Sequence, residues 1–214
     1  MREKNKNINA SLEDWAKITK SNAEIDYTGA MFAGILSTSP IVDRFAMWLL
    51  AGCGATAALM TANINNILPI LTVEGFKYSM VFLLLSALAG FLAKYYAIRC
   101  QVMYEADKKI RELAETVSDC HMESDSEIQE VAGRHGVHID AGVDIKRISE
   151  EFVSAFPNRN HKKLKTNMDR GIHDRLVAYK DAVKYLRWQG YLTFVEVLLF
   201  LAFVLTVIFY AKAI

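Results

Sequence analysis

The sequence has few cysteines and prolines and lacks the short motifs that mark common catalytic sites. Its 214 residues include three cysteines and three prolines. A small, odd number of cysteines argues against a disulfide framework. There is no P-loop, GxSxG, HExxH or dinucleotide fingerprint, and the cysteines and histidines do not have the spacing of a zinc site. We therefore expect no enzyme activity, no catalytic residue, no metal and no cofactor.

Charge is absent from two long stretches and nearly absent from a third. Phe45–Ala62 and Tyr78–Ala93 carry no charged side chain, and Tyr191–Ala211 carries only Glu196. About 20 helical residues cross a ~30 Å hydrocarbon core, so each stretch is long enough to span a bilayer. The sequence predicts an all-α integral membrane protein with three transmembrane helices and a long helical cytosolic stalk.

Positive charge is nearly absent from the loop between the first two apolar stretches and from the C-terminal end. Of 25 Lys and Arg residues, 23 precede the first span or lie from Lys94 to Arg187. The positive-inside rule then places the N-terminus and the stalk in the cytoplasm, and the C-terminus outside. Residues Met1–Lys6 are basic but no apolar core follows them, so we expect no signal peptide.

Four segments follow from these patterns. Residues 1–43 form a cytosolic or interfacial amphipathic segment, 44–99 a two-span hairpin, 100–188 the stalk and 189–214 the third transmembrane helix. Within the first segment, Ser11–Asp14 resembles a capping box that starts a short helix, which would lie on the bilayer or on the protein itself. Thr28–Thr38 is expected to form an interfacial helix that enters the first span at an angle.

The stalk has the pattern of two long helices. No glycine or proline lies between Phe91 and Met122, so the second span should continue as a rod, and a second helix should run from Thr166 into the third span. The first rod is acidic and the second basic, which favours antiparallel pairing within one chain or between chains. A heptad seam marks the first rod: Met103, Ala106, Ile110, Leu113, Val117 and Cys120.

Small residues recur four positions apart in both spans of the hairpin. Such pairs let helix backbones approach closely in lipid. They could simply close the hairpin, or one face could close it while the other packs against a neighbouring subunit; we favour a homo-oligomer. The pairs are Ala51/Ala55 and Gly54/Ala58 in the first span, and Ser86/Gly90 and Ala89/Ala93 in the second.

Glu196 is the most informative single residue, because an ionisable group inside a span is costly. Lys94 is predicted at a similar depth, so a Lys94–Glu196 ion pair is our main expectation. The alternatives are that both side chains snorkel to the interface separately, or that Glu196 forms an acidic ring in a pore.

Two polar segments are candidate sites outside the apolar core. Asn63, Asn65, Asn66 and Glu74 lie at the predicted outer mouth, as a simple turn or as polar rings that favour cations. A basic loop could bind a phosphate-bearing ligand such as a nucleotide, or anionic lipid, or it could be solvated beside the acidic rod. This loop contains Arg159, His161, Lys162, Lys163 and Lys165. We expect no binding to duplex nucleic acid.

A two-span hairpin that follows an N-terminal helix and continues into a charged helix, Tyr95–Leu113 (YYAIRCQVMYEADKKIREL), has the layout of one bacterial family. Over residues 11–120 the chain resembles SLATT-type small membrane effectors of anti-phage defence. The resemblance implies a pore in the bacterial inner (plasma) membrane and a nucleotide second messenger or its synthase as partner. The third span is additional to the two-span pattern, and no functional residue is carried over.

Together these features predict an oligomeric membrane effector that forms a gated ion channel or pore under the control of a nucleotide signal or partner protein. The alternative is a non-conducting membrane scaffold that docks a soluble cytosolic partner.

Overall fold

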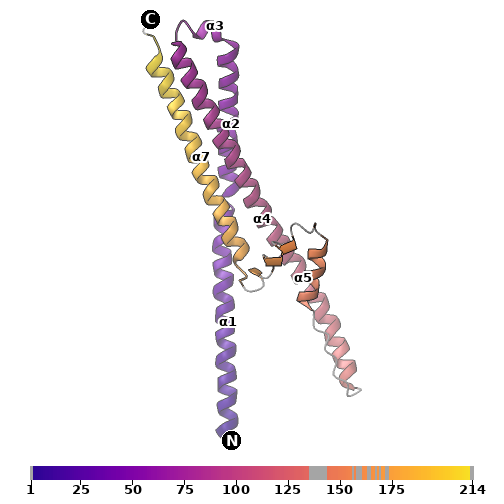
Figure 1. Ribbon diagram of the computed structural model, residues 1–214. Helices are drawn as coiled ribbons and strands as arrows, with labels where there is room; N and C mark the ends of the chain where they lie inside the picture. Colours follow the sequence, from indigo (N-terminus) through magenta and orange to yellow (C-terminus); the bar gives the residue numbers. More distant parts are fainter. Residues whose placement is uncertain are drawn as a thin grey trace. The chain divides into compact units, whose positions relative to one another are not determined.

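The fold is described from a computed structural model of the chain. It describes residues 2–134, 144–155, 157, 161–162, 165–166, 168, 170–171 and 174–212. The chain divides into two compact units, Met1–Met103 with Tyr179–Ile214, and Tyr104–Ala178. Figure 1 shows the helices of both units.

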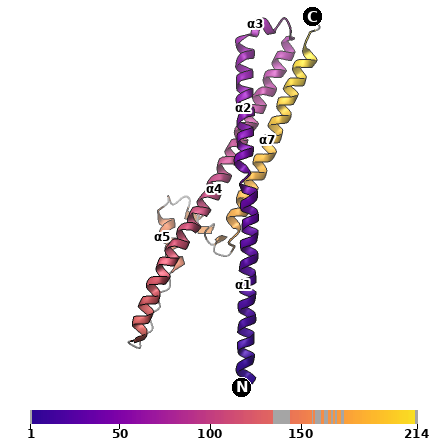
Figure 2. The ribbon, with the colours of Figure 1, turned by 180° about the vertical axis from the view of Figure 1, so that it is seen from behind.

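Three helices of the first unit form a bundle in an up-down-up arrangement. Helix α2 (Ser39–Ala62) and α7 (Val177–Tyr210) run in one direction, and the first half of α4 (Val73–Arg134) runs antiparallel to both (Figures 1 and 2). All three are long and apolar enough to cross a membrane. The predictions of an all-helical chain and of three helices of spanning length are therefore confirmed. Helix α7 passes through Gly190 without a break.

Helix α1 differs from the sequence prediction. It is one helix, Arg2–Leu36, so Ser11 lies inside it and does not start it. The break falls at Ser37–Thr38, and Pro40 then lies in the first turn of α2, where a proline costs no helical hydrogen bond. Helix α2 continues nearly in line with α1 (Figures 1 and 2), so the expected angle at this junction is wrong.

The other end of the bundle is closed by a short connection and a β-bridge. Asn63 ends α2, and α3 (Ile64–Ile67) leads to a bridge between Leu71 and Ala211. The backbone N–H of Lys212 donates to the carbonyl of Ile70 at 2.8 Å. The hairpin connection and the end of α7 therefore lie side by side.

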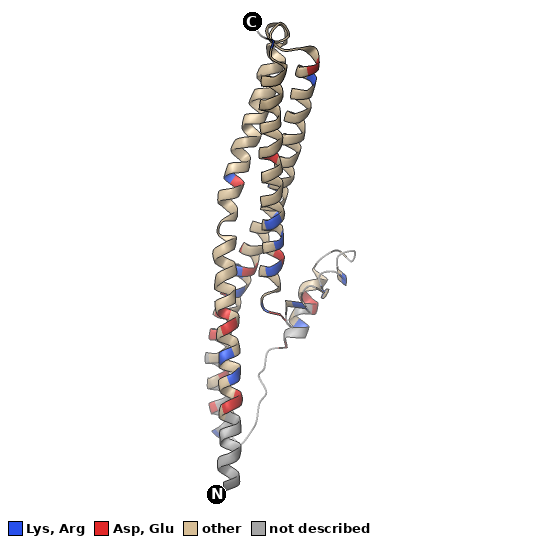
Figure 3. Cartoon of the chain, turned by 90° about the vertical axis from the view of Figure 1, so that its left-hand side faces the viewer, with Lys and Arg blue, Asp and Glu red and all other residues tan. Residues whose placement is uncertain are grey.

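Charge is unevenly distributed along the first unit. Most of the length of α2, α4 and α7 between the α1–α2 break and α3 carries few charged side chains (Figure 3). An apolar cluster fills the interior near α3, where Met60, Leu71, Leu83 and Phe203 are buried.

The second unit contains the rest of α4 and α5 (Ile145–Ser154), which Asp144 caps by accepting a hydrogen bond from the N–H of Arg147. Helix α4 is continuous to Arg134, as predicted for the first rod. The second predicted rod is interrupted: residues 174–176 form a turn, in which the Asp174 carboxylate accepts from the N–H of Leu176, and α7 begins only at Val177. The Asp174 carboxylate thus bonds the backbone two residues further on, which favours a turn over continuation of the preceding helix.

In the part of α4 that belongs to the second unit, ion pairs between described residues join positions three or four apart along the helix. The Lys109 ammonium lies 2.7 Å from Glu112 and lowers the pKa of that carboxyl. Asp107 pairs with Arg111 in the same way, at 2.8 Å. Exposed pairs of this kind contribute little to stability. Three residues of the predicted heptad seam, Ile110, Leu113 and Val117, are each more than 60% exposed.

Candidate functional site

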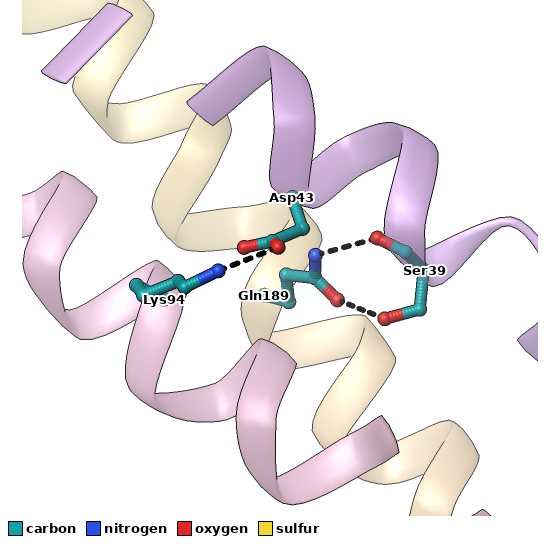
Figure 4. Close-up of polar contacts among 4 residues, drawn as sticks. All are labelled: Ser39, Asp43, Lys94 and Gln189. Atoms are coloured by element: carbon teal, nitrogen blue, oxygen red, sulfur yellow. Dashed lines mark hydrogen bonds and ion pairs between the residues drawn. The ribbon is translucent and has the colours of Figure 1, made fainter. Parts of the chain in front are cut away.

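A polar contact joins α7 to the start of α2. The Ser39 hydroxyl donates to Gln189 Oε1 at 2.9 Å, and Gln189 Nε2 donates to the Ser39 carbonyl at 3.1 Å (Figure 4). Both side chains are fully buried. A buried amide in a membrane helix must find its partners inside the protein. Gln189 finds two on one residue, beside the α1–α2 break.

Lys94 of α4 pairs with Asp43 of α2, not with Glu196. The ammonium lies 2.7 Å from Asp43 Oδ2, and the carboxylate is the more buried of the two groups (Figure 4). The predicted Lys94–Glu196 pair is therefore wrong. Glu196 lies against Gly90, which is one helical turn from Lys94, whereas Asp43 lies within reach of the ammonium.

Glu196 is enclosed by its own bundle. The residue has no exposed surface, and neither carboxyl oxygen has a hydrogen-bond partner. Its backbone carbonyl accepts a hydrogen bond from Ser86 at 3.0 Å, and Ser86 Oγ also lies 3.3 Å from Cys53 Sγ. Snorkelling of Glu196 to the interface is thus wrong. An acidic ring in a pore stays a prediction and would require α4 and α7 to separate.

The predicted outer-mouth residues gather at the α3 end of the bundle. Asn63, Asn65, Asn66 and Glu74 are all exposed there. The Asn63 side chain donates to the Leu59 carbonyl at 3.0 Å and so satisfies the end of α2. Glu74 lies in the first turn of α4, where a carboxylate interacts favourably with the helix dipole.

Three residues of the predicted basic loop line one cavity in the second unit. His161, Lys162 and Lys165 surround a space of about 340 Å³ together with Glu150 and Val153. The Glu150 carboxylate lies 3.7 Å from the Lys165 ammonium, so part of the positive charge is already neutralised. Arg159 and Lys163, the other predicted residues, lie outside the described residues.

The three spans present different surfaces to their surroundings. On α4 and α7 the exposed side chains are bulky, as in Leu84, Phe91, Phe194 and Leu205. Helix α2 instead has an exposed small-residue face. This face consists of Ala51, Gly54, Ala55, Ala58, Thr61 and Ala62.

The small-residue pairs predicted from the sequence are buried in α4 but exposed in α2. In α4, Ser86, Ala89, Gly90 and Ala93 are all buried within the bundle. In α2 both predicted pairs lie on the surface. A Cβ added at Gly54 would meet no atom within 4 Å.

Sequence reasoning missed Ser39, Asp43 and Gln189. A usable signal existed for α7, where Gln189, Thr193 and Glu196 follow at spacings of four and three and so share one helix face. All three are buried. Polar residues at helical spacing in a span indicate its inward face.

Comparisons of this chain with known protein families, with curated proteins and with solved structures found no match. Within the described residues, no group of three or more His, Cys, Asp or Glu side chains is arranged to hold a metal ion.

Proposed function

We propose that the protein is a homo-oligomeric membrane effector that forms a gated ion channel, with the small-residue face of α2 at the contact between subunits. The observation that carries the proposal is the difference between α2 and the other two spans. Bulky side chains on α4 and α7 suit contact with lipid chains. Small side chains on α2 let a second helix approach until backbones touch, and this packing drives helix association in lipid.

Conduction is supported by what such an assembly would bring together. The small-residue face ends at Thr61 and Ala62, and the exposed amides of Asn65 and Asn66 follow at the α3 end. Repeated around an axis at the end of the subunit contact, the Thr61 hydroxyl and the two amides would line a narrow path with polar side chains. The competing proposal is the non-conducting scaffold, which needs the subunit contact but no path.

Control by a signal is supported by the cavity at His161, Lys162 and Lys165. Its lysine ammonium groups suit a phosphate-bearing ligand, such as a nucleotide second messenger. A ligand can open the channel only through a difference in affinity between the closed and open states. Such a role, in the bacterial plasma membrane during anti-phage defence, is what the resemblance to SLATT-type effectors implies.

Two glycines of α2 provide a matched test. Gly54 lies on the small-residue face, whereas Gly52 lies about 200° around the helix, beside the bulky Trp48 and Leu59. A Cβ added at either position meets no atom within 4 Å in the single chain. Both substitutions also change helix propensity equally.

We expect Gly54→Leu to dissociate the oligomer and abolish ion flux, and Gly52→Leu to leave both unchanged. Mass would be measured by light scattering in detergent, and flux with a dye in liposomes. Equal effects of the two substitutions on mass would contradict the α2 contact. An intact oligomer with no flux, with and without added cyclic nucleotides, would leave the contact standing and favour the scaffold.

A further inference from the structure

The carboxyl group of Glu196 occupies a closed slot between α7 and α4. The floor of the slot is Gly90: a Cβ added there would overlap Oε1 and would lie 2.7 Å from the carboxyl carbon and 3.1 Å from Oε2. The carboxyl group therefore fills the space that any other residue at position 90 would need. A water molecule takes about 30 Å³, and the packing against Gly90 leaves no such room on that side.

The groups around the slot do not neutralise a negative charge. On α4, the nearest cation is Lys94, which is committed to Asp43 of α2 at 2.7 Å. On α2, the titratable group that faces this level is the Cys53 thiol, which contacts Ser86. On α7, Thr193 is buried, and its hydroxyl is itself without a partner.

We infer that Glu196 is a proton-binding site, in which the closed bundle holds the residue as a neutral carboxylic acid. An ionised carboxylate here would be a buried charge with neither a counter-ion nor a hydrogen bond, which is strongly unfavourable in an apolar interior. A metal ion or water needs space that the slot lacks, and a cation from a second subunit cannot reach a side chain that its own helices enclose. A proton neutralises the Glu196 carboxylate and needs no additional space in the slot.

Proton occupancy is thereby linked to the packing of α4 against α7. While the two helices stay together, the acid has no water to accept its proton. If they separate, the carboxyl group meets water and can ionise, and the charged form then opposes closure. The site lies inside one subunit, so this inference does not depend on the proposed contact through α2.

Infrared spectroscopy of the full-length protein in liposomes at neutral pH tests the inference directly. A protonated carboxylic acid has a C=O stretch that is well separated from the carboxylate bands and shifts in D₂O. We expect such a band in the wild type, its loss in Glu196→Gln and its retention in Glu74→Gln, a control at an exposed glutamate. Absence of the band from the wild type, or its persistence in Glu196→Gln, would overturn the assignment.

A second measurement, thermal unfolding, tests the position of the Glu196 carboxyl group without relying on Glu196→Gln. Gly90→Ala should lower the thermal midpoint of the wild type, because the new methyl group must displace the carboxyl group. In a Glu196→Ala background the same methyl group enters vacated space, so the loss should disappear. An equal loss in both backgrounds would show that the carboxyl group does not occupy the slot.

Discussion

The interior of the three-helix bundle has two halves with different chemistry. Near the α1–α2 break it is polar, with the Ser39–Gln189 contact, the Asp43–Lys94 pair and the enclosed Glu196. Near α3 it is mainly apolar, with Met60, Leu71, Leu83 and Phe203 packed together. Polar partners must meet at fixed distances, whereas apolar side chains in lipid can exchange one neighbour for another at little cost. The polar half therefore sets the register of the helices, and the apolar half holds them by close packing.

The largest effect should come from adding a methyl group to the apolar half. In Gly75→Ala the new Cβ would overlap Cβ of Tyr210 and lie 2.9 Å from its Cγ. The Tyr210 Cβ is fixed by the backbone and cannot rotate away, unlike the end of the Glu196 side chain that Gly90→Ala meets. We expect Gly75→Ala to cost about 1–3 kcal/mol and to exceed Gly90→Ala. Thermal unfolding in detergent would measure both.

Gly52→Ala is the control for that comparison, because a Cβ at Gly52 meets nothing within 4 Å. It should be neutral or slightly stabilising, since alanine favours a helix more than glycine does. If Gly90→Ala proved the more damaging substitution, the polar half would be the more rigid one, and the division of roles drawn above would be reversed.

A smaller effect should follow from removing one partner of the ion pair. Lys94→Met leaves the Asp43 carboxylate, which is 13% exposed, without its cation. The lysine side chain is 33% exposed, so solvent already screens part of the interaction. We expect a loss of roughly 1–2 kcal/mol.

The double variant Asp43→Asn/Lys94→Met should recover most of that loss, because no uncompensated charge then remains. Thermal midpoints of the four proteins in the cycle would measure the coupling. Additive losses would show that the two groups act independently, and the pair would then have no part in setting register.

Sequence reasoning found the helices but not their partners. Runs of uncharged or nearly uncharged residues located the three helices that are long and apolar enough to cross a membrane, α2, α4 and α7, because length and apolarity are local properties. The partner of Lys94 depended on which residue of another helix lies at the same level. The depths predicted from the sequence for Lys94 and Glu196 were similar, but such depths are not accurate to one helical turn. The burial of one set of small-residue pairs and the exposure of the other likewise depended on how α2 is rotated about its axis.

The start of α1 was missed for a local reason. Ser11–Asp14 has the form of a capping box, but such a motif starts a helix only when the preceding residues leave the helical conformation. Here residues from Arg2 onward are already helical, so the motif is internal to α1. The turn at Asp174 was missed because its carboxylate bonds the N–H of Leu176 and so favours a turn, which the apolar pattern does not reveal.

The smallest effect on stability should come from Gln189→Leu, and it is the variant that best separates register from stability. The substitution removes the two buried hydrogen bonds between Ser39 and Gln189, but leucine fills a similar volume. Interhelical hydrogen bonds in membranes average ~0.6 kcal/mol, so the total loss should be about 1 kcal/mol.

The contact joins α7 to the first residue after the α1–α2 break, and its loss should free that junction. The rate of backbone amide hydrogen exchange at residues 37–42 should therefore rise by more than the small change in thermal midpoint accounts for. The exchange rate at residues 203–210 of the apolar half should show no matching rise. A uniform rise along both segments would show that the polar half only contributes stability, as the apolar half does.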